Sequence, residues 1–414
     1  MHKVKHHIVN FLPALRSANY RLYFLGFTVS MIGTWFAAIA EQWLIYPTLS
    51  DDKSLVSLSY MVNLLPTALL VLFAGVFIDR MDKRKITIIF QILYALISLI
   101  LFVLIVLGHI QIWHVFLATF LAGIIFAFES TSRMTVMIDL VERKDLPSAL
   151  SLNGAIFNGA RAIGPALAGL IIATLGIPLA YLLNAISFFG VVWSLLAIKL
   201  PPHEPPKNTL SFKEEFKKGF RYIFQENEII ILLSILFLFS FFEFSTTTLM
   251  PIFAHDVFAK GEVGFGLLQS FIGIGAVTSG LLFSKIFEKT RNKFNLFVIA
   301  LIISVITGIL FSFSTNFVFS LSMKLIGGFV GSLVIALCST SIQLHVPNEL
   351  RGRIISFFTF CLLGGMAFGS LLLSQLINPL GPRVTYFVFM SSMSIFITII
   401  LFMKKNILIK KMNE

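Results

Sequence analysis

The feature that most constrains this chain is a series of long apolar stretches, separated by short polar turns, along its whole length. Each stretch has about the 20 residues that a helix needs to cross the hydrocarbon core of a bilayer. Because lipid cannot satisfy free backbone groups, such stretches fold as helices. The sequence therefore predicts an all-α membrane protein with twelve transmembrane helices, at residues 20–47, 54–78, 86–108, 112–138, 148–173, 177–198, 228–251, 263–284, 294–313, 317–344, 354–378 and 383–403.

The composition excludes a soluble protein. Of the 414 residues, 57% are hydrophobic and only 13% are charged, whereas a soluble domain has about 25% charged residues. The net charge of +12 does not indicate nucleic-acid binding, because the basic residues lie in short gaps between apolar stretches. Cys338 and Cys361 lie inside such stretches, so we expect them to serve as small packing residues.

The distribution of lysine and arginine predicts the orientation in the membrane. With the N-terminus inside, 26 of the 32 basic residues fall in cytoplasmic segments and three fall outside, at Lys53, Lys260 and Arg383. This bias follows the positive-inside rule and places both termini in the cytoplasm. The basic N-terminal segment precedes an apolar stretch too long for a signal peptide, so we expect a retained first helix.

The longest hydrophilic gap divides the predicted helices into two sets of six. We expect an N-terminal bundle at residues 1–199, a cytoplasmic linker at 200–227 and a C-terminal bundle at 228–414. The linker begins with the proline-rich sequence PPHEPP. It then repeats apolar residues at helical spacing, which predicts an amphipathic helix that lies either on the inner membrane surface or against cytoplasmic helix ends. These residues are Phe212, Phe216, Phe220 and Ile223.

The two sets of helices resemble each other when the sequence is shifted by about 205 residues. Gly75 then falls on Gly280, and Gly159 and Gly164 fall on Gly364 and Gly369. Parallel repeats of this kind are a known plan for transporters, with the pathway at the interface of the repeats.

A charged cluster, GVFIDRMDKRK, lies in the turn after the second predicted helix. It resembles the signature of the major facilitator superfamily, G-x-x-x-D-R-x-x-[RK]-[RK], with Asp82 where the common pattern has a second glycine. We expect the acidic residue to face a helix N-terminus and the basic residues to pair with carboxylates only when the cytoplasmic side is closed. Alternatively, the basic residues serve only as topology signals. The matching residues are Gly75, Asp79, Arg80, Lys83 and Arg84.

The fifth predicted helix carries Gly159, Gly164, Pro165 and Gly169, which resemble the glycine-proline "antiporter" motif of exporters in that superfamily. Steps of five residues place the glycines on several sides of a helix. Close packing of small residues is one way in which membrane helices associate. We expect the eighth helix, with Gly273, Gly275 and Gly280, to pack here and seal the two halves, or to have a purely structural role.

Three further stretches resemble the bacterial exporter branch that includes macrolide efflux proteins and the enterobactin exporter. They are GTWFAAIAEQWLIY, RMTVMIDLVERKDLPSALSLN and VPNELRGRIISF. The resemblance implies two six-helix bundles, alternating access and the efflux of drugs or siderophores. It also implies a monomeric, multi-pass protein of the bacterial inner membrane.

Six ionisable residues lie inside the predicted helices, where a charge is costly and therefore often functional. Glu129 and Arg133 are four residues apart, a spacing that permits a helical ion pair. Arg161 also needs a carboxylate, and Glu129 is our first choice. Glu243, among phenylalanines, is the predicted proton carrier, and Glu41 is the second candidate. The predicted coupling residues are Glu41, Glu129, Arg161, Glu243 and Lys324.

The sequence has no phosphate-binding loop, no dinucleotide fingerprint and no metal-ligand spacing. We therefore expect no enzyme activity, no cofactor and no bound metal. The leading hypothesis is the export of an amphipathic small molecule in exchange for protons. Alternatives are uptake by proton symport, lipid or lysolipid translocation and, from a different class, a receptor that transports nothing.

Overall fold

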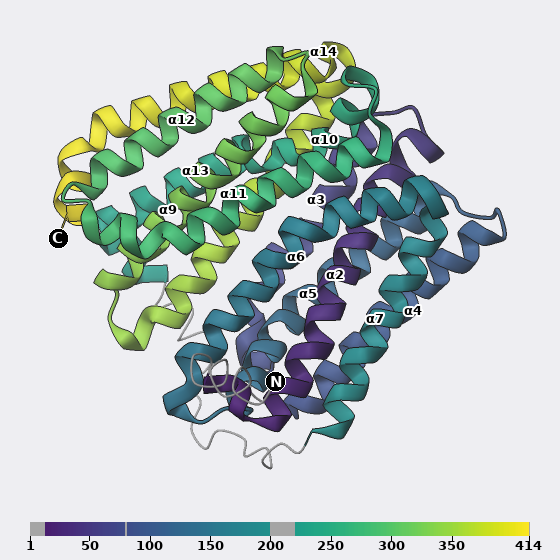
Figure 1. Ribbon diagram of the computed structural model, residues 1–414. Coiled ribbons are helices and arrows are strands. Elements are labelled where there is room, and N and C mark those ends of the chain that lie inside the picture. The colour runs from purple at the N-terminus through teal and green to yellow at the C-terminus, as the bar shows by residue number, and fades with distance from the viewer. Residues whose placement is uncertain (1–12, 79–80, 199–219, 414) are drawn as a thin grey trace, which may run out of the picture.

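The computed structural model describes residues 13–78, 81–198 and 220–413, which are almost entirely helical (Figure 1). The first half contains η1 (Pro13–Arg16), α2 (Ala18–Trp43), η2 (Leu44–Leu49), α3 (Ser54–Ile78), α4 (Lys83–Val106), α5 (Ile112–Asp139), η3 (Arg143–Asp145), α6 (Leu146–Leu175) and α7 (Ile177–Ala197). The second half contains α9 (Asn227–Phe242), η4 (Phe244–Leu249), α10 (Met250–Ile252), η5 (Phe253–Val257), α11 (Gly261–Lys289), α12 (Lys293–Phe313), α13 (Phe317–His345) and α14 (Asn348–Asn413).

The last helix contains two membrane spans. Eleven helices of the described residues are long and apolar enough to cross a bilayer, and the last apolar segment is 54 residues long. A straight helix of that length would extend about 80 Å, more than twice the hydrocarbon thickness. The segment bends back at Gly381, where φ is 73° and a glycine is favoured. The predicted twelve-helix fold is therefore confirmed.

Polar side chains begin the helices at the turns. Asp82 accepts hydrogen bonds from the backbone N–H groups of Arg84 and Lys85, both at 3.1 Å, at the start of α4. Asn292 accepts one from the N–H of Asn295 at 2.9 Å, at the equivalent turn of the second half. Such caps satisfy donors that have no partner inside the helix. The charged residue that replaces the second glycine of the signature thus has a structural role.

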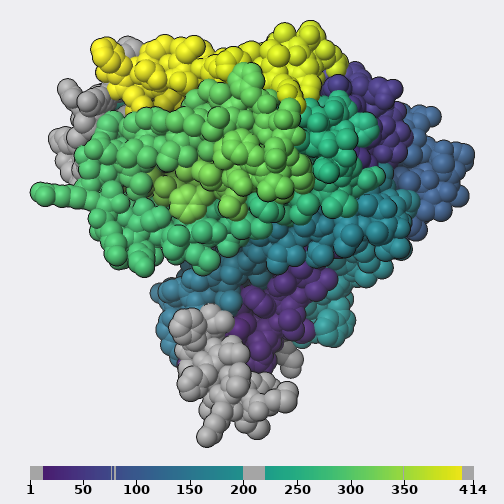
Figure 2. Space-filling model, turned by 45° about the horizontal axis from the view of Figure 1, so that its top comes forward, coloured from purple at the N-terminus to yellow at the C-terminus, as the bar shows by residue number. Residues whose placement is uncertain are grey.

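The helices form two groups, α2–α7 and α9–α14, which converge at one end and diverge at the other (Figure 1). The groups contact each other mainly through α6 with α11 and α3 with α14. The second half of α14, yellow in Figure 2, lies on the side of its group that faces away from the first group. We call the diverging end, with Lys83, Arg143 and Arg291, the basic end, and the other the opposite end.

The predicted linker lies mostly outside the described residues, so its boundaries and those of the two domains stay a prediction. Residues 220–225 are helical. The hydroxyl of Tyr222 donates to the carbonyl of His345 at 3.3 Å, and Ile223 is buried. The ring centroids of Phe220 and Phe357 lie 6.2 Å apart. This last part of the linker therefore packs against α13 and α14, which was one of the two predicted positions.

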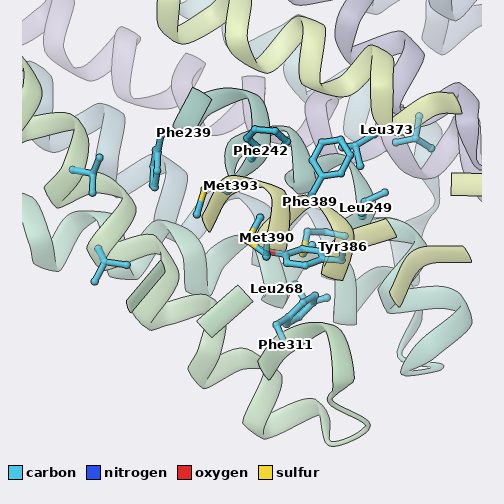
Figure 3. Close-up of a cluster of buried hydrophobic side chains, with 14 of the residues drawn as sticks. Phe239, Phe242, Leu249, Leu268, Phe311, Leu373, Tyr386, Phe389, Met390 and Met393 are labelled. Atoms are coloured by element: carbon cyan, nitrogen blue, oxygen red, sulfur yellow. The ribbon is translucent and has the colours of Figure 1, made fainter. Parts of the chain in front are cut away.

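Aromatic residues form much of the core of the second half (Figure 3). Phe242 from α9 packs against Phe389 from α14, with ring centroids 5.6 Å apart. Phe311 from α12 packs against Tyr386 from α14 at 5.1 Å. Cys338 is fully buried among apolar residues, as the sequence predicts. This core holds the helices around the polar residues of the second half.

Candidate functional site

The two halves meet closely where α6 crosses α11. Pro165 has no N–H group, so the carbonyl of Arg161 loses its usual partner inside the helix. The next N–H, of Ala166, donates across the interface to the hydroxyl of Ser270 at 2.9 Å. A Cβ atom at Gly273 would lie 2.3 Å from the Arg161 carbonyl oxygen. Backbone therefore touches backbone at this crossing, and only glycine fits.

The other residues of the glycine-proline motif have different neighbours. A Cβ at Gly169 would lie 2.5 Å from the carbonyl oxygen of Glu262 on α11, and a Cβ at Gly164 would lie 2.6 Å from Trp35 on α2. Gly159 has no atom within 4 Å of such a Cβ. The motif therefore packs on two sides of α6, toward its own half and toward the other half.

The glycines of α11 that were predicted to form one partner surface face different helices. Gly273 packs on α6, but Gly275 faces α13, where a Cβ would lie 2.1 Å from the carbonyl oxygen of Leu325. Gly280 has no atom within 4 Å. Of the three glycines predicted to form one partner surface, only Gly273 lies at the crossing with α6, and the prediction is wrong for the other two.

The seventh span is interrupted at Glu243. The α-helix α9 ends at Phe242, and 3-10, α-helical and π-helical turns follow. Hydroxyl groups satisfy carbonyls in the irregular segment: Thr246 donates to the carbonyl of Glu243 at 2.6 Å, and Thr248 donates to that of Ser245 at 2.9 Å. Transporters often place a binding site at an interrupted helix of this kind.

A cavity lies beside this break, in the second half, where Arg161 of the first half reaches it. Its empty space, including the part that is open to solvent, is about 460 Å³. The lining combines charged and hydroxyl groups with apolar and aromatic side chains. It consists of Arg161, Glu243, Phe244, Thr246, Thr247, Ile272, Thr307, Gly308, Phe311, Met323, Lys324, Gly327, Gly328 and Tyr386. The structure thus brings three of the five predicted coupling residues to one place.

Lys324 is buried and held by aromatic residues. Its Nζ donates a hydrogen bond to the hydroxyl of Tyr386 at 2.6 Å. The same atom lies 3.9 Å from the ring centroid of Phe311 and 4.4 Å from that of Tyr386, and Figure 3 shows these two rings together. Aromatic faces attract cations. Sequence reasoning missed both rings, although Tyr386 is a hydroxyl-bearing residue within an apolar stretch.

Glu243 lies in a more polar place than its neighbours in the sequence suggest. Only Phe244 among the surrounding phenylalanines lines the cavity, whereas Phe239 and Phe242 are buried in the core. The carboxylate interacts electrostatically with Lys324, and the hydroxyl of Ser304 lies nearby. Its Oε2 atom is buried and makes no hydrogen bond of good geometry among the described residues. Glu243 is thus buried, as expected of a residue among phenylalanines, but only one of the phenylalanines next to it in the sequence faces the cavity.

The predicted pair of Arg161 with Glu129 is also wrong. Glu129 accepts hydrogen bonds from Arg133 Nε at 3.1 Å and from Gln91 Nε2 at 2.8 Å, inside the first half. The predicted helical ion pair of Glu129 and Arg133 is therefore confirmed. Arg161 is buried and has no carboxylate partner among the described residues, and it interacts electrostatically with Tyr60.

Glu41 lies apart from the cavity, in the first half. Its Oε1 atom accepts a hydrogen bond from the hydroxyl of Ser59 at 3.3 Å. Tyr60, the next residue, interacts electrostatically with both Glu41 and Arg161. Glu41 therefore does not line the cavity, and Tyr60 lies between it and Arg161 electrostatically.

The charged turn lies at the basic end, where the halves separate. Cβ atoms added at Gly75 on α3, Gly154 on α6 and Gly280 on α11 would have no neighbour within 4 Å. Yet Lys83 pairs with Asp139 at 3.3 Å, within its own half.

Arg84 also makes its contacts within its own half. It donates to the carbonyls of Leu195 and Leu196, at 2.8 and 2.7 Å, and so caps α7. The expectation that contacts of these residues need a closed basic end is wrong for Lys83 and Arg84. Asp79 and Arg80 lie outside the described residues.

The opposite end is closed by polar contacts between the halves. Asp256 of the second half pairs with Lys53 at 2.6 Å and accepts a hydrogen bond from the hydroxyl of Tyr46 at 2.5 Å. His255 Nδ1 lies 2.7 Å from the same carboxylate. Sequence reasoning missed this cluster, although Lys53 is one of three basic residues predicted outside the membrane.

Two more contacts cross the interface at this end. The Asn378 amide donates to Asp52 at 2.7 Å, and the hydroxyls of Ser57 and Thr248 lie 2.8 Å apart. Hydrogen bonds from Asn378 and Ser54 lower the pKa of Asp52. The structure is thus closed at the opposite end and open at the basic end.

Comparison with known proteins agrees with this architecture. The chain matches the family described as transmembrane secretion effector over residues 10–414. It is 26% identical to the staphyloferrin A transporter of Staphylococcus aureus over 279 residues, which cover 65% of this chain and 67% of that protein. It is 23% identical to macrolide efflux protein A of Streptococcus pyogenes over 266 residues, 62% of this chain and 64% of that protein.

Solved transporter structures share the fold. The nucleoside transporter NupG superposes with a TM-score of 0.72 and 14% identity, over 94% of this chain and 98% of that one. A bacterial homologue of the human lysosomal transporter Spinster gives 0.70 and 12% identity, over 96% and 97%. The chain therefore belongs to the transmembrane secretion effector family of the major facilitator superfamily, and it is a multi-pass membrane transporter.

Proposed function

We propose that this protein exports an amphipathic small molecule in exchange for protons, by alternating access. One observation carries the proposal: charged groups from both halves line a single cavity that also has aromatic and aliphatic walls. A site of this kind suits a substrate with a polar part and an apolar part. Rearrangement of the two halves would close the basic end and open the opposite end.

Glu243 is the proposed proton carrier. One of its carboxylate oxygens makes no hydrogen bond of good geometry in the described residues, so a proton from cavity water can bind there. Lys324 competes with that proton because its positive charge stabilises the ionised carboxylate. Displacement of Lys324 from the carboxylate by a substrate would then favour protonation. Glu41 is a second candidate carrier outside the cavity.

The substrate class follows from the relatives only as a proposal. Their names refer to staphyloferrin A transport and to macrolide efflux, so a siderophore-like or drug-like molecule is the first class to test. We also propose a bacterial inner-membrane location, cytoplasmic termini and a monomer. The role of Asp79 and Arg80 in a gate at the basic end remains a prediction.

The test is transport by protein reconstituted into lipid vesicles with a controlled pH gradient. Siderophores and macrolides would be offered in turn, while internal pH and substrate are followed together. We expect the wild-type protein to concentrate one of them and to move protons only when that substrate is present. Glu243→Gln should abolish both effects while allowing exchange down a gradient.

The matched control is Glu288→Gln, a carboxylate at the exposed end of α11. It should behave like the wild-type protein. Accumulation by the Glu243→Gln protein at the wild-type rate would remove Glu243 from the coupling mechanism.

Lipid translocation is a second candidate function, favoured by an apolar groove on the flank of the first half. The groove has a volume of about 600 Å³ and is lined by residues of α3, α4 and α5, including Phe77, Phe90 and Phe128. A fluorescent lysolipid in the same vesicles would test this function. Movement of the lysolipid between leaflets that depends on the protein would favour it over export.

A further inference from the structure

We infer that the cavity selects substrates that carry a carboxylate or phosphate group, and that Arg161 binds this group. The inference rests on the proposed function and names the substrate chemistry that it requires.

The charges of the cavity do not balance. Glu243 and Lys324 interact with each other, and Lys324 is further held by the hydroxyl of Tyr386. Arg161 has no carboxylate partner in the part of the chain that the structure describes. The cavity therefore has one uncompensated positive charge, and a buried charge without a partner is costly. An anionic group on the substrate would compensate it.

Glu41 does not serve as this partner. It binds the hydroxyl of Ser59 and is not among the residues that line the cavity. Tyr60 lies within electrostatic range of both Glu41 and Arg161. A neutral phenol cannot neutralise a guanidinium, so the positive charge of Arg161 remains available to a ligand.

The position of Arg161 suits a ligand held between the halves. Its backbone lies at the crossing of α6 and α11, where the carbonyl faces Gly273. Its side chain belongs to the first half, whereas Glu243 and Lys324 belong to the second half. A guanidinium donates paired hydrogen bonds to carboxylates and phosphates, which a lysine cannot do with the same geometry.

The apolar walls then accommodate the rest of the molecule. Phe244, Phe311 and Met323 line the same cavity and come from the second half. We expect the anionic group to lie on Arg161 and the apolar body to extend along these side chains. A cation of similar shape would meet two positive charges and one negative charge, and it would bind less tightly.

Equilibrium binding of four matched probes tests the inference. Naphthylacetate, naphthyl phosphate, naphthylacetamide and naphthylethylamine share one apolar body and differ in the headgroup. The protein would be held in nanodiscs of uncharged phosphatidylcholine, without a pH gradient. We expect at least one anion to bind about tenfold or more tightly than the amide, the usual effect of a hydrogen bond to a charged group, and the amine to bind most weakly.

Variants assign the effect to Arg161. Arg161→Gln should remove the preference for the anion, and Arg161→Lys should retain part of it because the charge remains. Arg143→Gln, at an exposed turn of the basic end, is the matched control and should bind as the wild-type protein does. A monodisperse elution peak establishes that each variant is folded.

Two results would overturn the inference: equal binding of the four probes by the wild-type protein, or an unchanged anion preference in Arg161→Gln. If Arg161→Gln does not fold, the wild-type and Arg161→Lys measurements decide. An anion preference without proton-coupled transport would leave the inference intact and overturn the proposed function. Proton-coupled concentration of a substrate by a wild-type protein that binds the four probes equally would overturn the inference and leave the proposed function intact.

Discussion

At the scale of single residues, two carboxylates show what separates a structural charge from a reactive one. Both oxygens of Glu129 lie within hydrogen-bond distance of Arg133, and Gln91 donates to one of them. Glu243 has a buried oxygen that makes no hydrogen bond of good geometry in the described residues, next to a cavity. A satisfied group stabilises one arrangement, whereas an unsatisfied group can bind a proton or a ligand.

We predict that the Glu129–Arg133 pair contributes to stability through mutual neutralisation. Arg133→Gln should lower the free energy of unfolding by about 3 kcal/mol or more, because it leaves a buried carboxylate unpaired. The double variant with Glu129→Gln should recover much of this loss. Unfolding in mixed micelles measures both. If the double variant is as unstable as the sum of the single variants, the two residues do not act as a pair.

We predict that the hydroxyl of Tyr386 stabilises the buried ammonium of Lys324. Tyr386→Phe keeps the ring and should cost about 1.5–3 kcal/mol of stability, the usual contribution of a hydrogen bond to a charged group. Tyr181→Phe is the matched control, because the Tyr181 hydroxyl is buried without a partner in the described residues. It should cost nothing or be stabilising. Equal thermal shifts for the two variants would contradict the assignment.

The sequence could predict Glu129 and Arg133 as a pair because residues four positions apart share one helix face. It could also identify Arg161, Glu243 and Lys324 as costly charges in apolar helices. It could not predict which of them meet. Their neighbours come from elements about 60 to 160 residues apart, such as Tyr386 beside Lys324, and that proximity depends on the packing of whole helices.

At the scale of helices, the crossing of α6 and α11 depends on backbone approaching backbone. Apolar length predicts that both helices exist, and glycine predicts that they pack closely. Gly273 faces α6 and Gly275 faces α13. Which helix each glycine faces depends on how α11 is rotated about its own axis, and the sequence alone does not determine that rotation. The sequence also could not predict the end of the α-helix at Phe242. The residues that follow are apolar or carry hydroxyl groups, as residues within the helix do.

We predict that Gly273→Ala disrupts the crossing. The new Cβ would lie 2.3 Å from the carbonyl oxygen of Arg161, and a backbone atom cannot move aside alone. The halves should separate there, with loss of transport. Gly280→Ala is the control, since no atom lies within 4 Å, and alanine should raise helix stability by up to about 1 kcal/mol. Wild-type transport by Gly273→Ala would show that the crossing is not required.

At the scale of the whole molecule, two halves touch at one end and part at the other. The polar contacts that cross the opposite end involve few of the described residues, namely Asp256 with Lys53 and Tyr46, Asp52 with Asn378, and Ser57 with Thr248. A small number of polar contacts, most of them partly exposed, suits an equilibrium between two arrangements, because each contributes little free energy.

We predict that Lys53→Gln shifts this equilibrium toward an open opposite end. A partly exposed ion pair contributes at most about 1 kcal/mol, so the population should change by up to about fivefold. Asp256→Asn should shift it further, because this carboxylate also binds Tyr46 and His255. Distances between spin labels across this end would report the change. Lys260→Gln, an exposed neighbour, should leave them as in the wild-type protein.

We predict a defined pH dependence for the contact between Asp52 and Asn378. Its hydrogen bonds lower the pKa of Asp52, so the folded protein favours the ionised form. The stability that this contact contributes is present above the ordinary aspartate value of about 3.9 and is lost as pH falls through the lowered pKa. The difference in melting temperature between wild type and Asp52→Asn should therefore be constant from about pH 8 to 5. A decline within that range would refute the prediction.

The closed layer at the opposite end has an electrical consequence. Because the halves part at the basic end, water that enters there would share the potential of that compartment, and the membrane voltage would fall mainly across the closed layer that contains Ser57, Thr248 and Asp256. Each elementary charge that crosses this layer exchanges about 2.3 kcal/mol for every 100 mV. The field there would be steeper than across an unbroken bilayer, so the voltage would act on protons and charged substrates mainly within this layer.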